Sequence, residues 1–224
     1  MLLMYSLREC CACARSYDSK NRHEGEVVFI GSSIFHFWRT LARDMRPLPV
    51  INNAAGGYRS GQLVRHAVGL TGASPLVVIY VGSNDIRFGV PATDAAANVA
   101  AIIDLLLQHV PARRIILVGA IASPDQNAAI VNHLNRLYYD LCAEKNAALS
   151  TGVKDDRVFF VNPNSVMEAH PDYYRWDNIH LTEAGYAALT QVVRPAVERM
   201  WSLIGSTADA GHSNQVIPLA TALE

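Results

Sequence analysis

One segment constrains the fold of this chain more than any other, the run PLVVIYV at residues 75–81. It is almost wholly apolar and rich in β-branched residues, which is typical of a strand that protein covers on both faces. Strands of that kind belong to parallel sheets that lie between two layers of helices. The segment therefore predicts an α/β fold.

Shorter β-rich runs and helical patterns alternate on both sides of this segment. The β-rich runs cover residues 26–30, 48–51, 114–121 and 157–161. The helical patterns cover residues 34–45, 93–110, 126–148 and 182–201. Thr182 stands at the N-cap of the last one, which has apolar residues at helical spacing: Tyr186, Leu189, Val193 and Val197. Strands that alternate with helices form βαβ units with right-handed crossovers, so we predict a five-stranded parallel sheet in a three-layer α/β/α sandwich.

The composition supports one domain of enzyme size. Half of the 224 residues are apolar and 17% are charged, which is enough to build a sizeable core. We expect a catalytic domain over residues 26–204, an N-terminal extension over 1–25 and a C-terminal tail over 205–224. The formal net charge of -1 gives no electrostatic drive toward nucleic acid. No apolar run reaches the roughly 20 residues that a membrane span requires.

The N-terminal extension contains three clustered cysteines, Cys10, Cys11 and Cys13. No second cysteine pair stands at the spacing of a zinc site, so we expect neither a metal nor a cofactor. Arg8 and Glu9 interrupt the apolar start of the chain before the core of a secretory signal could form. We therefore expect a reduced, cytoplasmic protein, and the role of the three cysteines stays open.

Short polar blocks follow the predicted strands. They are Gly31-Ser32-Ser33, Gly56-Gly57, Gly82-Ser83-Asn84-Asp85 and, after a longer loop, Asp177-Asn178-Ile179-His180. In parallel sheets the ligand site lies outside the carboxyl ends of the strands. The spacing therefore predicts that these blocks meet at one edge of the sheet.

Together the blocks resemble the SGNH, or GDSL-type, serine hydrolase family, from about residue 27 to the last helix. The strings FIGSSIFHFW, VIYVGSNDI and DNIHLTEAGY are similar to a branch with GSS in place of GDS, where Ser32 replaces the Asp. The resemblance implies a flavodoxin-like sheet with strand order 2-1-3-4-5. It also implies a triad of Ser33, His180 and Asp177, and an oxyanion hole made of Ser33, Gly57 and Asn84.

The chemistry of these residue types agrees with that implication. A serine hydroxyl becomes a good nucleophile when a neighbouring histidine takes its proton, and a carboxylate orients the histidine and stabilises its protonated form. Ser32 and Gly56 are the adjacent alternatives to Ser33 and Gly57. Each block taken alone is also explained as a turn or a helix cap.

We expect a metal-independent serine esterase that forms an acyl-enzyme with short, acetyl-like acyl groups, because the chain leaves little length for a lid. Its partner is a small-molecule ester. A thioesterase or carbohydrate acetylesterase with the same site is the alternative among enzymes, and a ligand-binding flavodoxin-like module is the non-catalytic alternative. The natural acyl and leaving groups and any homo-oligomer stay open. We further expect Trp38 and Trp176 to be packing residues, and Asp85 to brace the loop that carries Asn84.

Overall fold

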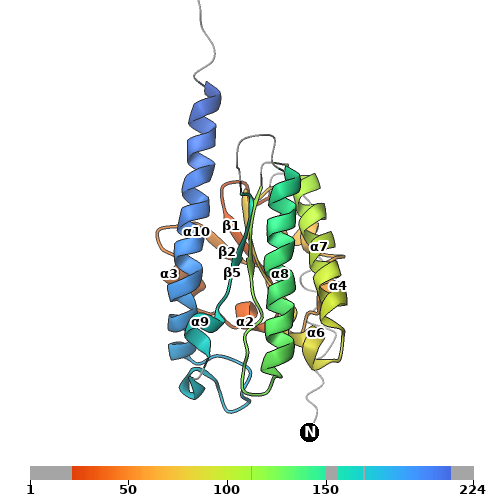
Figure 1. Ribbon diagram of the computed structural model, residues 1–224. Helices are drawn as coiled ribbons and strands as arrows, with labels where there is room; N and C mark the ends of the chain where they lie inside the picture. Colours follow the sequence, from red (N-terminus) through yellow and green to blue (C-terminus); the bar gives the residue numbers. More distant parts are fainter. Residues whose placement is uncertain (1–21, 112, 150–155, 169, 213–224) are drawn as a thin grey trace, which may run out of the picture.

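The computed structural model describes residues 22–111, 113–149, 156–168 and 170–212 (Figure 1). All the candidate site residues lie within these ranges. Cys10, Cys11 and Cys13 lie outside the described residues. Within these ranges, no helix is both long and apolar enough to span a bilayer.

Five parallel strands form one sheet with the order β2-β1-β3-β4-β5. The strands are β1 (Val27–Gly31), β2 (Val50–Asn52), β3 (Leu76–Tyr80), β4 (Arg114–Val118) and β5 (Val158–Val161). The central strand β3 is buried along its whole length, and its Val78 pairs with Phe29 of β1 and Ile116 of β4. The five predicted strands and their predicted order are confirmed.

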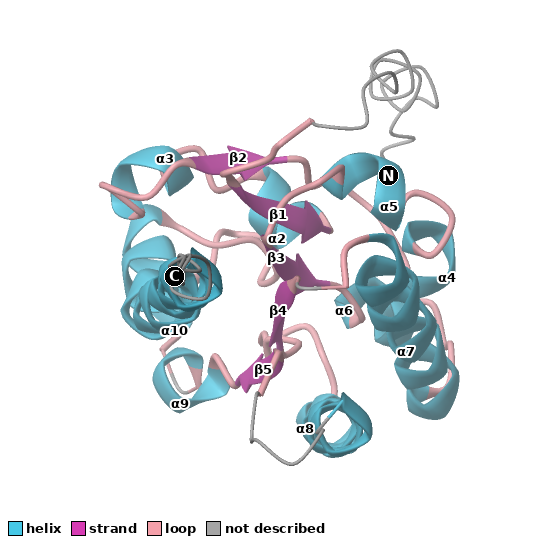
Figure 2. Ribbon diagram, turned by 90° about the horizontal axis from the view of Figure 1, so that it is seen from above, coloured by secondary structure: helices cyan, strands magenta, loops and turns pink. Residues whose placement is uncertain are grey.

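Two layers of helices cover the sheet, which confirms the three-layer prediction (Figure 2). One face carries α2 (Ser33–His36), α3 (Leu41–Asp44), α9 (Asn164–Met167) and α10 (Glu183–His212). The other carries α4 (Ser60–Leu63), α5 (Ala67–Thr71), α7 (Ala92–His109) and α8 (Ala128–Leu149). Successive strand residues point to opposite faces, so Val78 packs in the first layer and Val77 in the second. The short helices α6 (Ser83–Arg87) and η1 (Pro171–Tyr173) complete the set.

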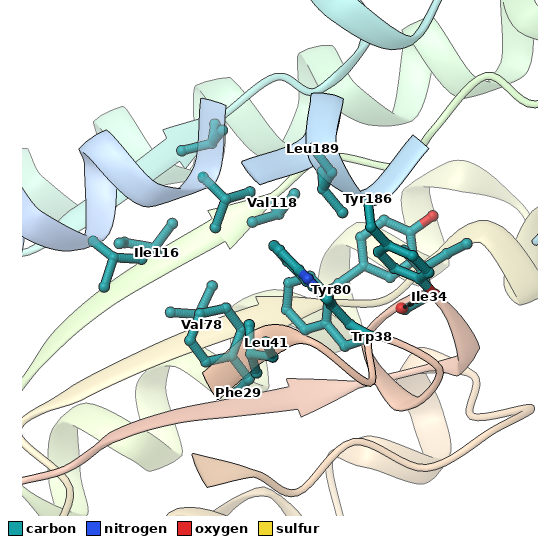
Figure 3. Close-up of a cluster of buried hydrophobic side chains, with 14 of the residues drawn as sticks. Phe29, Ile34, Trp38, Leu41, Val78, Tyr80, Ile116, Val118, Tyr186 and Leu189 are labelled. Carbon is teal, nitrogen blue, oxygen red and sulfur yellow. Dashed lines mark hydrogen bonds between the residues drawn. The ribbon is translucent and has the colours of Figure 1, made fainter. Parts of the chain in front are cut away.

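An aromatic cluster joins α10 to the start of α2 (Figure 3). The Trp38 ring stacks on Tyr186 with centroids 5.7 Å apart, and its indole N–H donates to Asp44 over 2.9 Å. The Tyr186 hydroxyl donates to the Ile34 carbonyl over 2.8 Å. Trp38 is therefore a packing residue, as predicted, and the predicted apolar face of α10 is buried as well.

Two predicted helices differ from the structure. The helix expected over residues 34–45 is divided into α2 and α3, because the backbone tightens where the Trp38 N–H donates to the Phe35 carbonyl and the Arg39 N–H to the Phe37 carbonyl. The helix expected to end at residue 201 continues to His212, beyond the expected domain limit at 204. The Thr182 cap is confirmed, since its Oγ1 accepts the Gly185 N–H over 3.2 Å.

The remaining long helices agree with prediction, and the short ones were missed. Helices α7 and α8 begin and end within two residues of the predicted ranges. Helices α4, α5, α6 and α9 have only four or five residues each. A helix that short is not stable on its own, so its formation depends on tertiary contacts that a local pattern does not contain.

The contact between β1 and β3 at Gly31 yields a stability prediction. Gly31 has a φ of +135°, and a Cβ there would lie 1.9 Å from the Tyr80 carbonyl oxygen. Gly31→Ala should therefore lower the free energy of unfolding by more than about 3 kcal/mol, as measured by urea denaturation followed by circular dichroism. Gly25→Ala is the control, because Gly25 has a φ of +83° with open space around it and should cost only about 1–2 kcal/mol. Equal losses in the two variants would contradict the steric explanation.

Candidate active site

Ser33 stands at the carboxyl end of β1, near the centre of the sheet. A single residue, Ser32, separates the last residue of β1 from Ser33 at the start of α2. The Ser32 N–H donates to the Tyr80 carbonyl over 2.9 Å, and only 1% of Ser32 is exposed. Ser33 is partly exposed, and its hydroxyl has no hydrogen-bond partner in the part of the chain that the structure describes. Of the two serines, Ser33 is the one that a substrate can reach.

Asp177 and His180 are joined by a short hydrogen bond within one turn. His180 Nδ1 lies 2.6 Å from Asp177 Oδ2. The other carboxylate oxygen accepts the backbone N–H groups of Ile179 and His180 over 3.0 and 2.9 Å. Asn178 has a left-handed φ of 56°, which turns the chain tightly enough for these contacts. The carboxylate is thus held in place before it acts on the imidazole.

The surroundings of Asp177 keep its side chain ionised. Burial raises the pKa of the carboxyl, but the backbone N–H and ring of His180 and the backbone N–H of Ile179 outweigh burial and lower the pKa below its ordinary value. An ionised carboxylate in this position is an acceptor for a hydrogen bond from Nδ1 of His180.

Phe37 connects the helix that begins at Ser33 with the turn that carries His180. The Phe37 ring meets the His180 ring edge to face, with centroids 5.0 Å apart. The Ser33 carbonyl accepts the Phe37 N–H over 2.9 Å. Arg175 lies over the Phe37 ring, with its guanidinium carbon 5.9 Å from the ring centroid. The backbone N–H of Arg175 donates to the His180 carbonyl over 2.7 Å. These contacts hold Ser33 and His180 at the same edge of the sheet.

Gly57 and Asn84 arrive at this edge from the strands on either side of β1. The Ala55 N–H donates to the Gly31 carbonyl over 3.0 Å, so the segment that leads to Gly57 runs beside the end of β1. The Asn84 side-chain amide donates one N–H to the Tyr58 carbonyl over 3.0 Å. This bond orients the amide and leaves its second N–H for another acceptor.

The backbone distinguishes Gly57 from Gly56. Gly57 has a φ of +81°, and nothing lies within 4 Å of the position that a Cβ would occupy. Gly56 has no such φ, and its nearest neighbour is the His36 ring at 3.8 Å from that position. Only Gly57 therefore combines a conformation that favours glycine with open space for an approaching group.

Asp85 braces the segment that carries Asn84, as predicted. It is 1% exposed and accepts the Ser60 N–H over 2.9 Å and the Ser60 hydroxyl over 2.6 Å. Asn98 donates to the same hydroxyl over 3.0 Å. The start of α6 is thereby tied to α4 and α7.

The prediction that Trp176 is a packing residue is wrong, because the side chain is 92% exposed. The Asn178 N–H donates to the Arg175 carbonyl over 2.9 Å, so Trp176 is a central residue of a tight turn. The sequence also gave no sign of a site role for Phe37 or Arg175, since Phe37 fits the apolar spacing of a helix. Among the residues that the structure describes, no group of His, Cys, Asp or Glu is arranged to hold a metal ion.

A five-stranded parallel sheet of order 2-1-3-4-5, with Ser, Gly, Asn and an Asp–His pair at its carboxyl edge, is the fold of the SGNH hydrolases. Residues 30–188 match the model of the GDSL-like lipase/acylhydrolase family. The chain belongs to this family and is a carboxylic ester hydrolase.

Individual relatives agree with that family. The chain is 26% identical over 207 residues to platelet-activating factor acetylhydrolase IB subunit alpha2 of Gallus gallus, with 86% of this chain and 82% of that protein covered. A solved structure from Streptococcus pneumonia, described as a platelet activating factor, has a TM-score of 0.70 at 22% identity, with 83% and 91% covered. A GDSL-like lipase from Bacteroides thetaiotaomicron has a TM-score of 0.64 at 21% identity, with 86% and 96% covered. At these identities the two solved structures show likeness of fold alone.

The lowered pKa of Asp177 predicts a pH-dependent contribution to stability. Because the folded-state pKa lies below the unfolded-state pKa, the contribution is full above the unfolded-state value and is lost as pH falls through the folded-state value. Asp177→Asn keeps an oxygen for the two backbone N–H groups but loses the charged partner of His180. We expect it to lower the free energy of unfolding by about 1–3 kcal/mol at pH 7, measured by urea denaturation. The difference from the wild type should narrow below about pH 4, and a gap that stays constant down to pH 2 would contradict the assignment.

Proposed function

We propose that this chain is a serine esterase that hydrolyses short-chain, acetyl-like carboxylic esters through Ser33, His180 and Asp177. The observation that carries the proposal is the 2.6 Å hydrogen bond between Asp177 Oδ2 and His180 Nδ1. The carboxylate is anchored by two backbone N–H groups and stays ionised, so it orients the imidazole and favours its protonated form during the reaction. A module that only binds a ligand has no need of this arrangement.

In the first half of the reaction, His180 Nε2 takes the proton of the Ser33 hydroxyl while Oγ attacks the acyl carbon. The carbonyl oxygen gains negative charge in the tetrahedral intermediate. The backbone N–H of Ser33, the backbone N–H of Gly57 and the second amide N–H of Asn84 are the donors for that oxygen. One such donor stabilises the transition state by about 3–4 kcal/mol in a well-organised site. The Ser33 hydroxyl has no hydrogen-bond partner among the described residues, and catalytic hydrogen bonds often form fully only when substrate binds.

The intermediate collapses when the bond to the leaving oxygen breaks and His180 gives its proton to that oxygen. The alcohol departs and the acyl group stays on Ser33 Oγ. A water molecule then loses a proton to His180 Nε2 and attacks the acyl carbon. The carboxylic acid leaves, the proton returns to Ser33, and the enzyme is restored.

The short connections that leave β1 and β3 favour short acyl groups. One residue separates β1 from α2, and residues 81 and 82 alone separate β3 from α6. Loops of this length supply little apolar surface around Ser33. A long acyl chain gains about 0.8 kcal/mol of binding free energy for each methylene only where such a surface buries it. The name of the Gallus gallus relative, an acetylhydrolase, also supports an acetyl group.

Two adjacent serines provide a matched test of the nucleophile. Ser33→Ala should lower kcat for p-nitrophenyl acetate at least about 10³-fold, because it removes the attacking oxygen. Ser32→Ala should keep kcat within about tenfold of the wild type, because Ser32 is buried and donates through its backbone. If Ser32→Ala loses activity and Ser33→Ala keeps it, the nucleophile is Ser32. A wild-type rate no higher than that of Ser33→Ala would favour the ligand-binding alternative.

A series of esters tests the acyl group. We expect kcat/KM to be highest for p-nitrophenyl acetate or butyrate and to fall steadily from the octanoate to the laurate, because longer chains gain no buried contact. A maximum of kcat/KM at the octanoate or the laurate would contradict the short-chain assignment. Acetyl thioesters and acetylated xylose, measured beside the acetate, decide between the esterase and the alternatives that use the same site.

A further inference from the structure

An arginine-lined cavity of about 480 Å³ lies between α3, the start of α10 and the turn that carries His180. Its wall contains four arginines and two acidic residues: Arg39, Arg43, Arg175, Arg194, Asp44 and Glu183. When Glu198, the ion-pair partner of Arg194, is included, four guanidiniums stand against three carboxylates, which leaves an excess of one positive charge. Two of the arginines already have acidic partners, because Arg43 pairs with Asp44 over 3.0 Å and Arg194 pairs with Glu198 over 2.7 Å.

The other two arginines are available to a ligand. Arg39 is exposed, and its side chain has no hydrogen-bond or ion-pair partner among the described residues. Arg175 donates its Nε–H to the Leu181 carbonyl over 2.9 Å, which leaves its terminal N–H groups free within the described ranges. Arg39, Arg175 and Tyr186 all line the cavity, so the two guanidiniums border the same space. Burial raises the pKa of Tyr186, while the charges of Arg175 and Arg39 act in the opposite direction.

The cavity and the active site share a wall. Phe37 lines the cavity and presents its ring to His180 at 5.0 Å. Arg175 lines it too, and its backbone N–H holds the His180 carbonyl. A group bound in the cavity thus lies near His180, which gives its proton to the leaving oxygen in the proposed mechanism.

We propose that this cavity is a subsite for a phosphate-type oxyanion, bound between Arg39 and Arg175. Guanidinium groups match phosphate oxygens with paired N–H donors, and a phosphate monoester carries a charge of about -1.5 to -2 at neutral pH, which the guanidinium charges of Arg39 and Arg175 attract. The oxyanion is either free phosphate or a phosphate group on the alcohol half of the ester, and the second source rests on the proposed function.

Binding of inorganic phosphate is the first test, measured by calorimetry at constant ionic strength on the whole chain. We expect the wild type to bind phosphate, Arg39→Gln to bind about tenfold more weakly, and Arg39→Lys to recover part of the loss by keeping the charge. Arg65→Gln is the matched control, because Arg65 is an exposed arginine between α4 and α5 on the opposite face of the sheet. Absence of phosphate binding, or equal affinities in Arg39→Gln and Arg65→Gln, overturns the subsite.

Two acetyl esters then distinguish the sources of the phosphate. The wild type hydrolyses acetylated glycerol 3-phosphate with a lower KM than acetylated glycerol if the group belongs to the substrate. Arg39→Gln then loses that preference, and inorganic phosphate competes with the charged ester but not with the neutral one. Phosphate binding without such a preference assigns the subsite to the free ion.

The same measurements separate this proposal from the proposed function. Phosphate binding does not use the Ser33 hydroxyl, so Ser33→Ala should bind phosphate like the wild type. Binding without hydrolysis of either ester contradicts the esterase and leaves the subsite standing. Hydrolysis of the neutral ester without phosphate binding contradicts the subsite alone.

Discussion

Gly31 and the Tyr80 carbonyl approach each other so closely that no side chain fits between them, and the position of the site depends on this contact. It lets the chain leave β1 and enter α2 within one residue, while the Ser32 N–H is satisfied by the same carbonyl. Ser33 is therefore presented at the middle of the edge. Because β1 lies between β2 and β3, the exits of its two neighbours bring Gly57 and Asn84 to either side of Ser33. Three adjacent strands thus supply the proposed nucleophile and the proposed oxyanion donors.

The acid and the base reach this edge in another way. Asp177 and His180 belong to a turn far along the chain, which backbone pairing at Tyr174 and Leu181 closes and the Phe37 ring contacts at His180. Phe37 touches His180 from the side of α2, and Tyr186 binds the backbone of α2 from the side of α10. The packing of α10 on the sheet therefore also helps to position His180, the proposed base. This shared packing explains why the arginine-lined cavity borders the active site.

Much of the site was predictable because its parts are local in sequence. Asp177 and His180 lie three residues apart, and the other polar residues directly follow strands. Once a parallel sheet is assumed, residues in these places are expected at its carboxyl edge. Phe37, Arg39 and Arg175 were not predictable as site residues. Their contacts join segments that are distant in sequence, and Phe37 also satisfies the apolar pattern of an ordinary helix. For Trp176 the prediction was wrong in the other direction, because it assigned a packing role to a residue that has none. A tryptophan is usually largely buried, but Trp176 lies in a tight turn and is exposed to solvent.

The sequence by itself determined the number of strands, their parallel arrangement, the long helices α7 and α8, and the blocks that carry the chemistry. Hydrophobic periodicity specifies these features, because it records which faces must be buried. Only the tertiary structure decided that residues 34–45 form two short helices, that Ser33 rather than Ser32 is accessible, and that Gly57 rather than Gly56 needs to be glycine. Each of these differences depends on the position of a single residue or on a single backbone angle. Packing against elements that are distant in sequence sets these positions and angles, and no local pattern in the chain encodes that packing.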